Sequence, residues 1–273
     1  MRCLTPESIP HPGGVQGERL TIPCGKCAIC KTNRREEWIV RLLEELKEHT
    51  KAVFITLTYD DLKCHAQKIC NKNVNKRVVQ AFIKALRKLV KQKIRYYAIS
   101  EYGPRTERPH YHIICYNLSI NDYNSINNAW NLGNVVVTEL NIRRISYTAK
   151  YHVNKTEYPL GREPPFALMS KGIGIGYTKR MSKYHDGDIK KSHYQYYQWK
   201  KRLPRYWQNK LYTEEERKQI ASIVTSDIYS EEKRNEYEKK YPGHSYFEYI
   251  QQKLKENERK FKDKSIQAFN RKI

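Results

Sequence analysis

The sequence predicts an α+β fold around a central antiparallel sheet. The run Phe54-Ile55-Thr56-Leu57-Thr58-Tyr59 is rich in β-branched and aromatic residues, which is typical of a strand. By contrast, residues 75–91 repeat apolar side chains at the spacing of one buried helix face. Residues 94–102 and 110–116 also have strand character, and the polar turn between them predicts a hairpin.

The expected elements follow the chain in a simple order. A Pro-, Gly- and Cys-rich segment ends near Lys31, and a helix capped by Thr32 or Asn33 then ends near His49. After it we expect a strand at 51–59, a helix at 75–91, strands at 94–102 and 110–116, a helix at 121–131, a strand at 133–140 and a helix at 143–155.

A β-α-β-β-α-β order of this kind is typical of a ferredoxin-like, split βαβ core, in which the first and third strands lie centrally. Residues 159–176 are predicted to form a loop, and the chain from Glu214 is charged and helical. We therefore expect three parts. They are a Cys-rich segment with a helix packing on the core (1–50), the core (51–158), and a basic, aromatic and helical C-terminal region (159–273).

The charge of the chain favours a polyanionic partner. The formal net charge is +23 at pH 7, and such a charge repels itself in a compact fold unless a partner neutralises it. No apolar run reaches the roughly 18 residues of a spanning helix, so nucleic acid is favoured over a membrane. The N-terminus lacks the apolar segment of a secretory signal, and seven cysteines then point to a reducing cytoplasm.

Two histidines mark a candidate metal site. His110 and His112 lie one residue apart in a predicted strand, so their side chains point to the same face. Glu101, near the end of the preceding strand, can complete a three-ligand set for a divalent metal. The alternative is a pair of surface histidines on a half-buried strand.

Two tyrosines follow on one helix face. Tyr147 and Tyr151 have i,i+4 spacing, and a phenolate there can attack phosphorus and displace a 3′-hydroxyl. Lys150 and Lys155 supply positive charge that favours the ionised phenol and can contact phosphate. In a chain with 22 tyrosines, ordinary packing is the alternative.

Clustered cysteines predict a second metal site. Cys24, Cys27 and Cys30 supply three thiolates, and Cys3 can be the fourth ligand of a structural zinc ion. Free thiols and an iron–sulfur cluster remain alternatives.

Basic residues are the candidate DNA contacts. They include Arg105, Arg108, Arg143 and Arg144 near the histidines and tyrosines, and Lys200, Arg202 and Arg205 interleaved with Trp199, Tyr206 and Trp207. A solvated charged face is the alternative for the second group. Gly172 to Gly176 lacks a preceding strand and the Lys-Ser/Thr ending of a phosphate loop, so no nucleotide site is expected.

Three motifs together resemble the HUH-type rolling-circle replication initiators. They are the strand 54–59, His110-Tyr111-His112 followed by Ile113-Ile114, and Tyr147-Thr148-Ala149-Lys150-Tyr151. The tyrosine pair with Lys155 is similar to the initiators of microviruses, and the cysteine segment with Arg34, Arg35 and Trp38 to their gokushovirus branch. The resemblance covers about residues 1–180.

The resemblance implies a metal-dependent endonuclease and strand transferase that uses Mg²⁺ or Mn²⁺. One tyrosine would nick single-stranded or supercoiled viral DNA at the origin and stay linked to its 5′ end. The second would cut again after one round of synthesis, and the strand would be rejoined. Host DNA polymerase and helicase would be partners in the cytoplasm of a bacterial host. The rivals are a non-catalytic basic DNA-binding protein, a relaxase or transposase of a mobile element, and a zinc-bound adaptor.

Overall fold

The computed structural model describes residues 3, 5–10, 17, 19–66, 72–103, 106–153, 158–196, 199–226, 231–246, 248–249, 251–253, 255–256 and 259. By their contacts the residues form two compact units, one of residues 35–181 and one of residues 1–34 with 182–273. Each unit is described by itself. None of the described helices is long and apolar enough to cross a bilayer.

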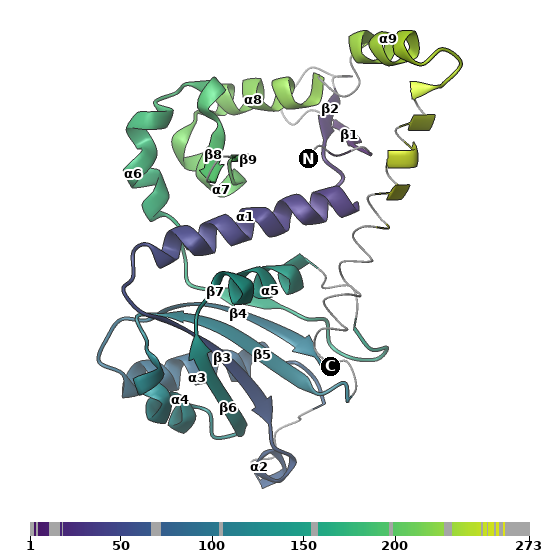
Figure 1. The fold of residues 1–273 in the computed structure, drawn as a ribbon. Coiled ribbons are helices and arrows are strands. Elements are labelled where there is room, and N and C mark those ends of the chain that lie inside the picture. Colours follow the sequence, from purple (N-terminus) through teal and green to yellow (C-terminus); the bar gives the residue numbers. More distant parts are fainter. Residues whose placement is uncertain are drawn as a thin grey trace. The chain divides into compact units, whose positions relative to one another are not determined.

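The unit of residues 35–181 is built on a five-stranded antiparallel sheet (Figure 1). Its strand order is β6-β3-β5-β4-β7, so the first and third strands of the predicted core are adjacent and central, as expected. The predicted hairpin of the second and third strands is also confirmed. The bounds are β3 Ala52–Tyr59, β4 Arg95–Tyr102, β5 Pro109–Tyr116, β6 Gly133–Glu139 and β7 Ala167–Met169.

Helices cover both faces of this sheet (Figure 1). On one face, α3 (Lys76–Leu89) and α4 (Tyr123–Ala129) pack through Phe82 and Ile126 against strand residues such as Ile55 and Ile113. On the other face, α1 (Ala28–Leu46) and α5 (Ile142–Val153) pack through Leu42 and Ile145 against Phe54, Tyr97 and Ile114. Burying both faces gives the sheet the two apolar cores that hold it together.

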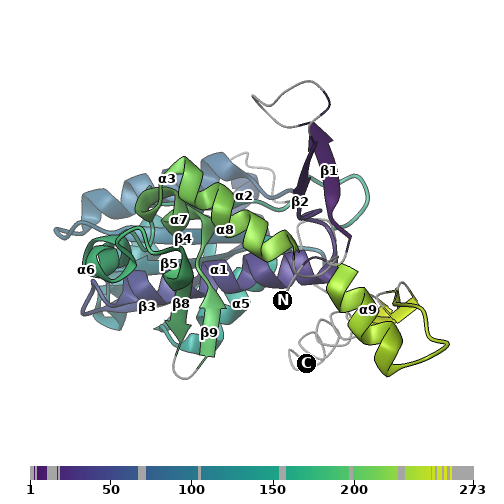
Figure 2. The same ribbon diagram turned by 90° about the horizontal axis from the view of Figure 1, so that it is seen from above.

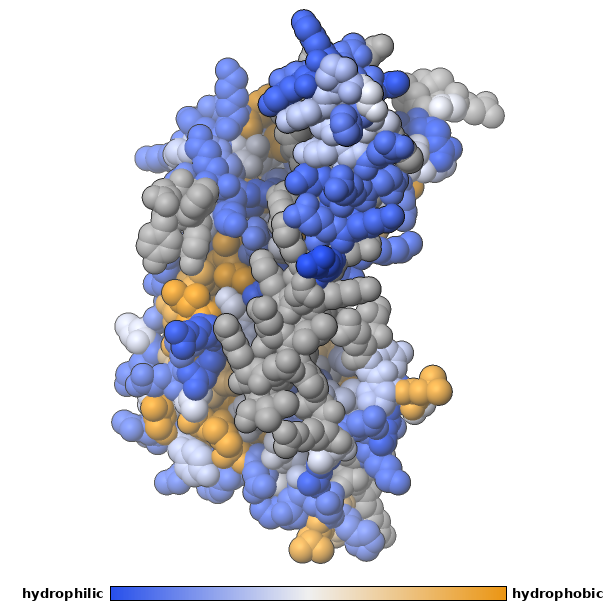
Figure 3. All heavy atoms as spheres, turned by 45° about the vertical axis from the view of Figure 1, so that its right-hand side comes forward, coloured by the Kyte–Doolittle hydropathy of each residue, from blue (hydrophilic) through white to orange (hydrophobic). Residues whose placement is uncertain are grey.

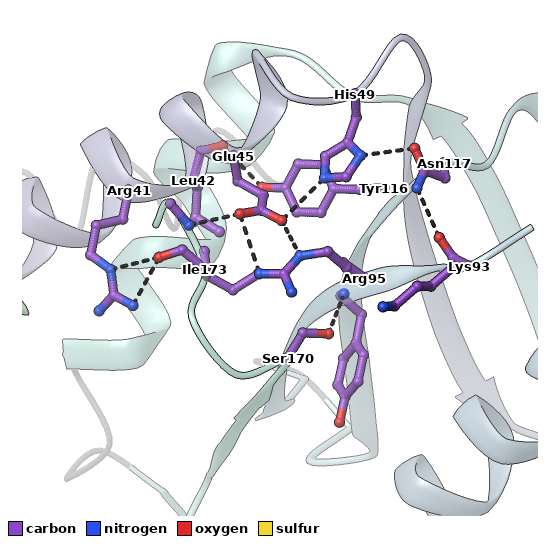
Figure 4. Close-up of polar contacts among 12 residues, drawn as sticks. Arg41, Leu42, Glu45, His49, Lys93, Arg95, Tyr116, Asn117, Ser170 and Ile173 are labelled. Atoms are coloured by element: carbon purple, nitrogen blue, oxygen red, sulfur yellow. Dashed lines mark hydrogen bonds and ion pairs between the residues drawn. The ribbon is translucent and has the colours of Figure 1, made fainter. Parts of the chain in front are cut away.

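A buried carboxylate fixes α1 to this unit. Glu45 is 2% exposed and binds Arg95, the ring of His49 and the backbone N–H of Gly174, the last at 2.7 Å (Figure 4). Burial raises the pKa of the Glu45 carboxyl, but the Arg95, Gly174 and His49 hydrogen bonds outweigh it, so the pKa lies below its ordinary value. Glu45 is therefore a charged anchor, because its ionised form has several partners.

The segment predicted as a loop at 159–176 contains strand β7. Only three residues long, β7 pairs with β4 at the sheet edge and carries no pattern long enough to be recognised in the sequence. The glycine run therefore does follow a strand, which corrects one reason for rejecting a nucleotide site. The N–H of Gly174 is nevertheless occupied by the Glu45 carboxylate.

Gly174 is expected to tolerate no side chain. Its φ is +75°, and a Cβ there would lie 2.7 Å from the Arg41 carbonyl oxygen. Gly161 has the same φ of +75° with nothing within 4 Å, so Gly161→Ala is a matched control. We expect Gly161→Ala to cost about 1 kcal/mol from backbone strain. Gly174→Ala should cost about 3 kcal/mol, because overpacking adds to that strain.

Denaturant unfolding of the two glycine variants and the unchanged chain measures this difference. Equal losses of unfolding free energy at Gly161 and Gly174 would contradict close packing of the glycine loop against α1.

The unit of residues 1–34 and 182–273 has smaller elements. A hairpin of β1 (Glu7–Pro10) and β2 (Arg19–Ile22) adjoins the start of α1 (Figures 1 and 2). Tyr194, Leu203 and Trp207 are buried in the later part of the unit. Its other elements are α6 (Gly176–His185, from Ser182 on), η2 (Ile189–Lys191), β8 (His193–Tyr196), β9 (Trp199–Arg202), α7 (Arg205–Leu211), α8 (Glu214–Ser226) and α9 (Glu231–Lys240).

Several predicted boundaries are corrected. The first helix begins at Ala28, before the predicted cap at Thr32 or Asn33, because the Cys27 carbonyl accepts the N–H of Lys31 and starts the helical ladder. The short helix α2 (Asp61–Ala66) and the 3₁₀ turn η1 (Ile120–Asp122) were not predicted. Leu89, predicted to be buried in α3, is 49% exposed because it lies in the last turn.

Candidate functional site

The strand register places three predicted metal ligands on one face of the sheet. Glu101 of β4 lies directly opposite His110 of β5, and His112 is two residues further along β5. Side chains two apart on a strand share a face, so all three lie on the face covered by α5. Tyr111, between the histidines, points into the opposite core, where its hydroxyl bonds with that of Tyr59.

Helix α5 brings one predicted nucleophile to these residues. The Tyr147 hydroxyl donates to the Glu101 carboxylate, with O–O distances of 2.9 and 3.2 Å to the two oxygens. It lies 3.5 Å from Nε2 of His112, which is itself 2.9 Å from Glu101. Glu101 and His112 are buried, so these contacts also satisfy polar groups that water does not reach.

Outer partners orient both histidine rings. Nδ1 of His110 lies 2.6 Å from the Arg108 carbonyl oxygen. A carbonyl only accepts, so this nitrogen carries the proton and Nε2 offers a lone pair. Nδ1 of His112 lies 3.0 Å from the Thr56 hydroxyl, which can accept or donate and so fits either tautomer of the ring.

The donor set suits a divalent metal in its chemistry. Two imidazoles and a carboxylate are ligands that Mn²⁺ and related ions accept. Within the described residues, however, the only group of three or more metal-ligating side chains gathered closely together is made of cysteines. The structure thus brings Glu101, His112 and Tyr147 together and puts His110 across from Glu101, without the three metal ligands converging tightly.

The other predicted catalytic residues are placed only in part. Lys150 is half-buried on α5, three residues after Tyr147. Tyr151 follows in the same helix, and its side chain lies outside the described residues. Lys155 and Arg105 also lie outside them.

Predicted DNA contacts in this unit lie beside the site. Arg108 directly precedes β5 and pairs with Asp61 at 2.6 Å. Arg143 is exposed in the first turn of α5, and the next residue, Arg144, lies over the ring of Phe54 at 5.9 Å. Two of these arginines are thus held by partners, and Arg143 is on the surface.

The C-terminal basic group is a surface of cations without its predicted tryptophan. Lys200, Arg202 and Arg205 lie at least partly on the surface, whereas Trp207 is fully buried against Tyr194. Trp207 therefore packs in a core and offers no stacking surface, which corrects its predicted role. The side chain of Trp199 lies outside the described residues. Hydrophilic side chains, drawn in blue, predominate on the face that Figure 3 shows.

The four predicted zinc ligands lie together. The Sγ atoms of Cys3, Cys24, Cys27 and Cys30 are all within 4.8 Å of one another. Burial raises the pKa of the Cys24 thiol, but hydrogen bonds, foremost one with Thr5, outweigh it and lower the pKa to about 6. Burial raises the pKa of Cys27 and of Cys30 above the ordinary thiol value.

Two contacts of the site were missed from the sequence. Phe54 stacks on the His112 ring at 5.4 Å, and Thr56 bonds to the same ring from the neighbouring strand. Both lie in a run that alternates faces, so the sequence holds the signal that they share one face. Which ring they meet depends on the β3–β5 register, where Thr56 pairs with His112.

Comparisons with known proteins place the chain among phage proteins. The model of the replication-associated protein ORF2 family matches residues 52–157. Replication-associated protein ORF2 of Spiroplasma virus 4 is 31% identical over 255 residues, which is 77% of this chain and 79% of that protein. Replication-associated protein VP4 of Bdellovibrio phage phiMH2K is 28% identical over 60% of this chain and 58% of its own length. No solved structure gives a significant match.

The matched region contains the whole β3–α5 segment and thus the histidines, Glu101 and Tyr147. These matches define the class of protein as a replication protein of phages. The chain belongs to the replication-associated protein ORF2 family, as the extent of its similarity to the Spiroplasma virus 4 protein shows.

Proposed function

We propose that this protein initiates rolling-circle replication by nicking one DNA strand and later rejoining it. The observation that carries the proposal is the placement of Tyr147, whose hydroxyl meets Glu101 and approaches His112 on the histidine face of the sheet. A tyrosine that only filled space would have no need of a buried carboxylate and an imidazole beside its oxygen. The formal charge of +23 supports a DNA substrate.

The nicking step is a transesterification. The Tyr147 oxygen attacks the scissile phosphorus, the bond from phosphorus to the 3′ oxygen breaks, and the phenolic proton passes to a base. Glu101 accepts the hydrogen bond from this hydroxyl and is placed to receive that proton. The released 3′ oxygen gains a proton and can prime synthesis. One phosphoester replaces another, so the linkage can later be reversed without a nucleotide cofactor.

Glu101, His110 and His112 are the residues that would hold Mg²⁺ or Mn²⁺. The bound ion would polarise the scissile phosphate and stabilise charge that develops on its oxygens. The lone pair on Nε2 of His110 and the Thr56 contact of His112 support this assignment.

The second tyrosine completes the cycle. Tyr151 lies one turn after Tyr147 in α5 and would cut the regenerated origin after one round of synthesis. The new 3′-hydroxyl then attacks the first phosphotyrosine and closes the strand. Lys150 and Lys155 would hold phosphates near the tyrosines. Arg105, Arg108, Arg143 and Arg144, with Lys200, Arg202 and Arg205, would contact the DNA backbone.

The strand order supports an HUH-type, ferredoxin-like core at residues 51–158, flanked by the Cys-rich segment and a basic C-terminal region. The DNA would be the viral origin, single-stranded or supercoiled. Synthesis and unwinding would come from a host polymerase and helicase in the cytoplasm of an infected bacterium.

A covalent adduct tests the proposal. The purified chain is mixed with Mn²⁺ or Mg²⁺ and labelled single-stranded fragments that tile the phage genome encoding it. We expect a metal-dependent protein–DNA band on an origin fragment that survives boiling in detergent. Tight DNA binding with no adduct on any fragment would favour a non-catalytic binding protein instead.

A further inference from the structure

The four-cysteine cluster is a feature that strand nicking does not use. Among the six cysteines that the structure describes, Cys64 and Cys115 are buried in the sheet unit, and the other four lie within residues 1–34. Cys3 precedes the β1–β2 hairpin, Cys24 follows it, and Cys27 and Cys30 lie at the start of α1. Residues 21 positions apart in the chain are thus gathered at one point.

We propose that Cys3, Cys24, Cys27 and Cys30 bind a single structural Zn²⁺ ion in a tetrahedral thiolate site. Zn–S bonds of about 2.3 Å place the sulfurs of such a site about 3.8 Å apart. Here the Sγ–Sγ distances include 3.6 Å for Cys3–Cys24, 4.0 Å for Cys3–Cys27 and 4.0 Å for Cys24–Cys30. The spacing therefore fits one ion that contacts all four sulfurs.

The sulfur spacing argues against the other two uses of such a cluster. A disulfide requires an S–S distance near 2.05 Å, and the 3.6 Å between Cys3 and Cys24 is far longer. An iron–sulfur cluster puts several irons between its cysteines and separates their sulfurs more widely than the 4.8 Å limit found here. A mononuclear site remains, and zinc is the usual occupant of four thiolates.

The backbone is arranged to support charged sulfurs. The N–H of Cys24 points at Cys3 Sγ at 3.4 Å, that of Cys27 at Cys24 Sγ at 3.4 Å, and that of Cys30 at Cys27 Sγ at 3.5 Å. Gly25 adopts a φ of +71°, which the tight turn after Cys24 requires. Cys30 also lies in the first turn of α1, where the helix dipole favours negative charge.

The ion would act as a staple for the N-terminal segment. Four thiolates this close repel one another, and a bound cation removes that repulsion. By joining Cys3 to Cys24 it closes the base of the β1–β2 hairpin, and by joining both to Cys27 and Cys30 it attaches the hairpin to the start of α1. Loss of the ion should therefore release residues 1–30 and leave the sheet unit folded.

Metal content of the full-length chain tests this inference without any nicking assay. The protein is purified under reducing conditions with zinc supplied, and we expect one zinc and no iron per chain by elemental mass spectrometry. Cys24→Ser and Cys27→Ser should each lose the ion. Cys64→Ser is the matched control and should keep it, because Cys64 is a separate thiol buried in α2.

Two further measurements keep the inference testable if a serine variant folds poorly. Cobalt substitution of the unchanged chain should give intense thiolate-to-cobalt charge-transfer bands and the d–d pattern of a tetrahedral site. Removing zinc with a chelator should expose residues 1–30 to protease while residues 52–150 stay protected. Four freely titrating thiols in zinc-supplied protein, a pair of disulfides, bound iron, or unchanged protease protection after zinc removal would overturn the proposal.

Discussion

Tyr147→Phe should abolish formation of the first covalent adduct, with a fall in initial rate on the order of 10³-fold or more. The change removes one oxygen, the proposed nucleophile, and keeps the ring that meets Phe54 edge-on at 6.5 Å and His112 at 5.2 Å. Folding should thus be retained, with about 1 kcal/mol lost with the hydrogen bond to Glu101. The measurement is the rate of detergent-resistant adduct formation on a single-stranded origin fragment.

The second tyrosine gives a contrasting result. Tyr151→Phe should still form the first adduct and fail at the second cut, so a nicked product accumulates and no closed circle forms. Tyr96→Phe is the matched control, because Tyr96 packs against the opposite core of the same sheet. Normal adduct formation by Tyr147→Phe combined with its loss in Tyr151→Phe would reverse the assigned order of the two nucleophiles.

The parts of the fold that could be predicted are those with a strong local period. Residues of α3 repeat at helical spacing, and Asn75 caps that helix with its side chain on the Arg77 N–H, so the predicted start holds. Strands β3 to β6 each fill seven or eight residues and are rich in β-branched or aromatic side chains. Strand β7 and the β1–β2 hairpin are too short to carry such a period.

The candidate site follows the same division. Alternation along one strand predicts that His110 and His112 share a face, because this needs only the period of two. Placing Glu101 opposite His110 requires the hairpin register, which the turn between β4 and β5 sets. The contact of Tyr147 with Glu101 depends on how α5 packs across the sheet, and no local pattern encodes that packing. The cysteine cluster likewise depends on a fold that returns Cys3 to Cys24.

Glu101→Gln should separate the metal-binding role of this residue from its contact with Tyr147. The amide keeps the size of the carboxylate and an oxygen that accepts from the tyrosine hydroxyl, but it removes the negative charge. We expect adduct formation at fixed Mn²⁺ to fall about 100-fold and the half-saturating Mn²⁺ concentration to rise about 10-fold or more. Titration of Mn²⁺ against initial adduct rate measures both effects.

The metal titration distinguishes two roles that a single rate cannot. If Glu101 is a ligand, high Mn²⁺ restores part of the lost rate, because occupancy limits the variant. A loss that Mn²⁺ does not relieve would mean that Glu101 acts only as the proton acceptor of Tyr147. Glu139→Gln is the control, since Glu139 is exposed at the end of β6 and should leave the titration unchanged. Binding of the fragment, followed by fluorescence anisotropy, should not weaken in Glu101→Gln, because removing a carboxylate beside a phosphate lowers electrostatic repulsion.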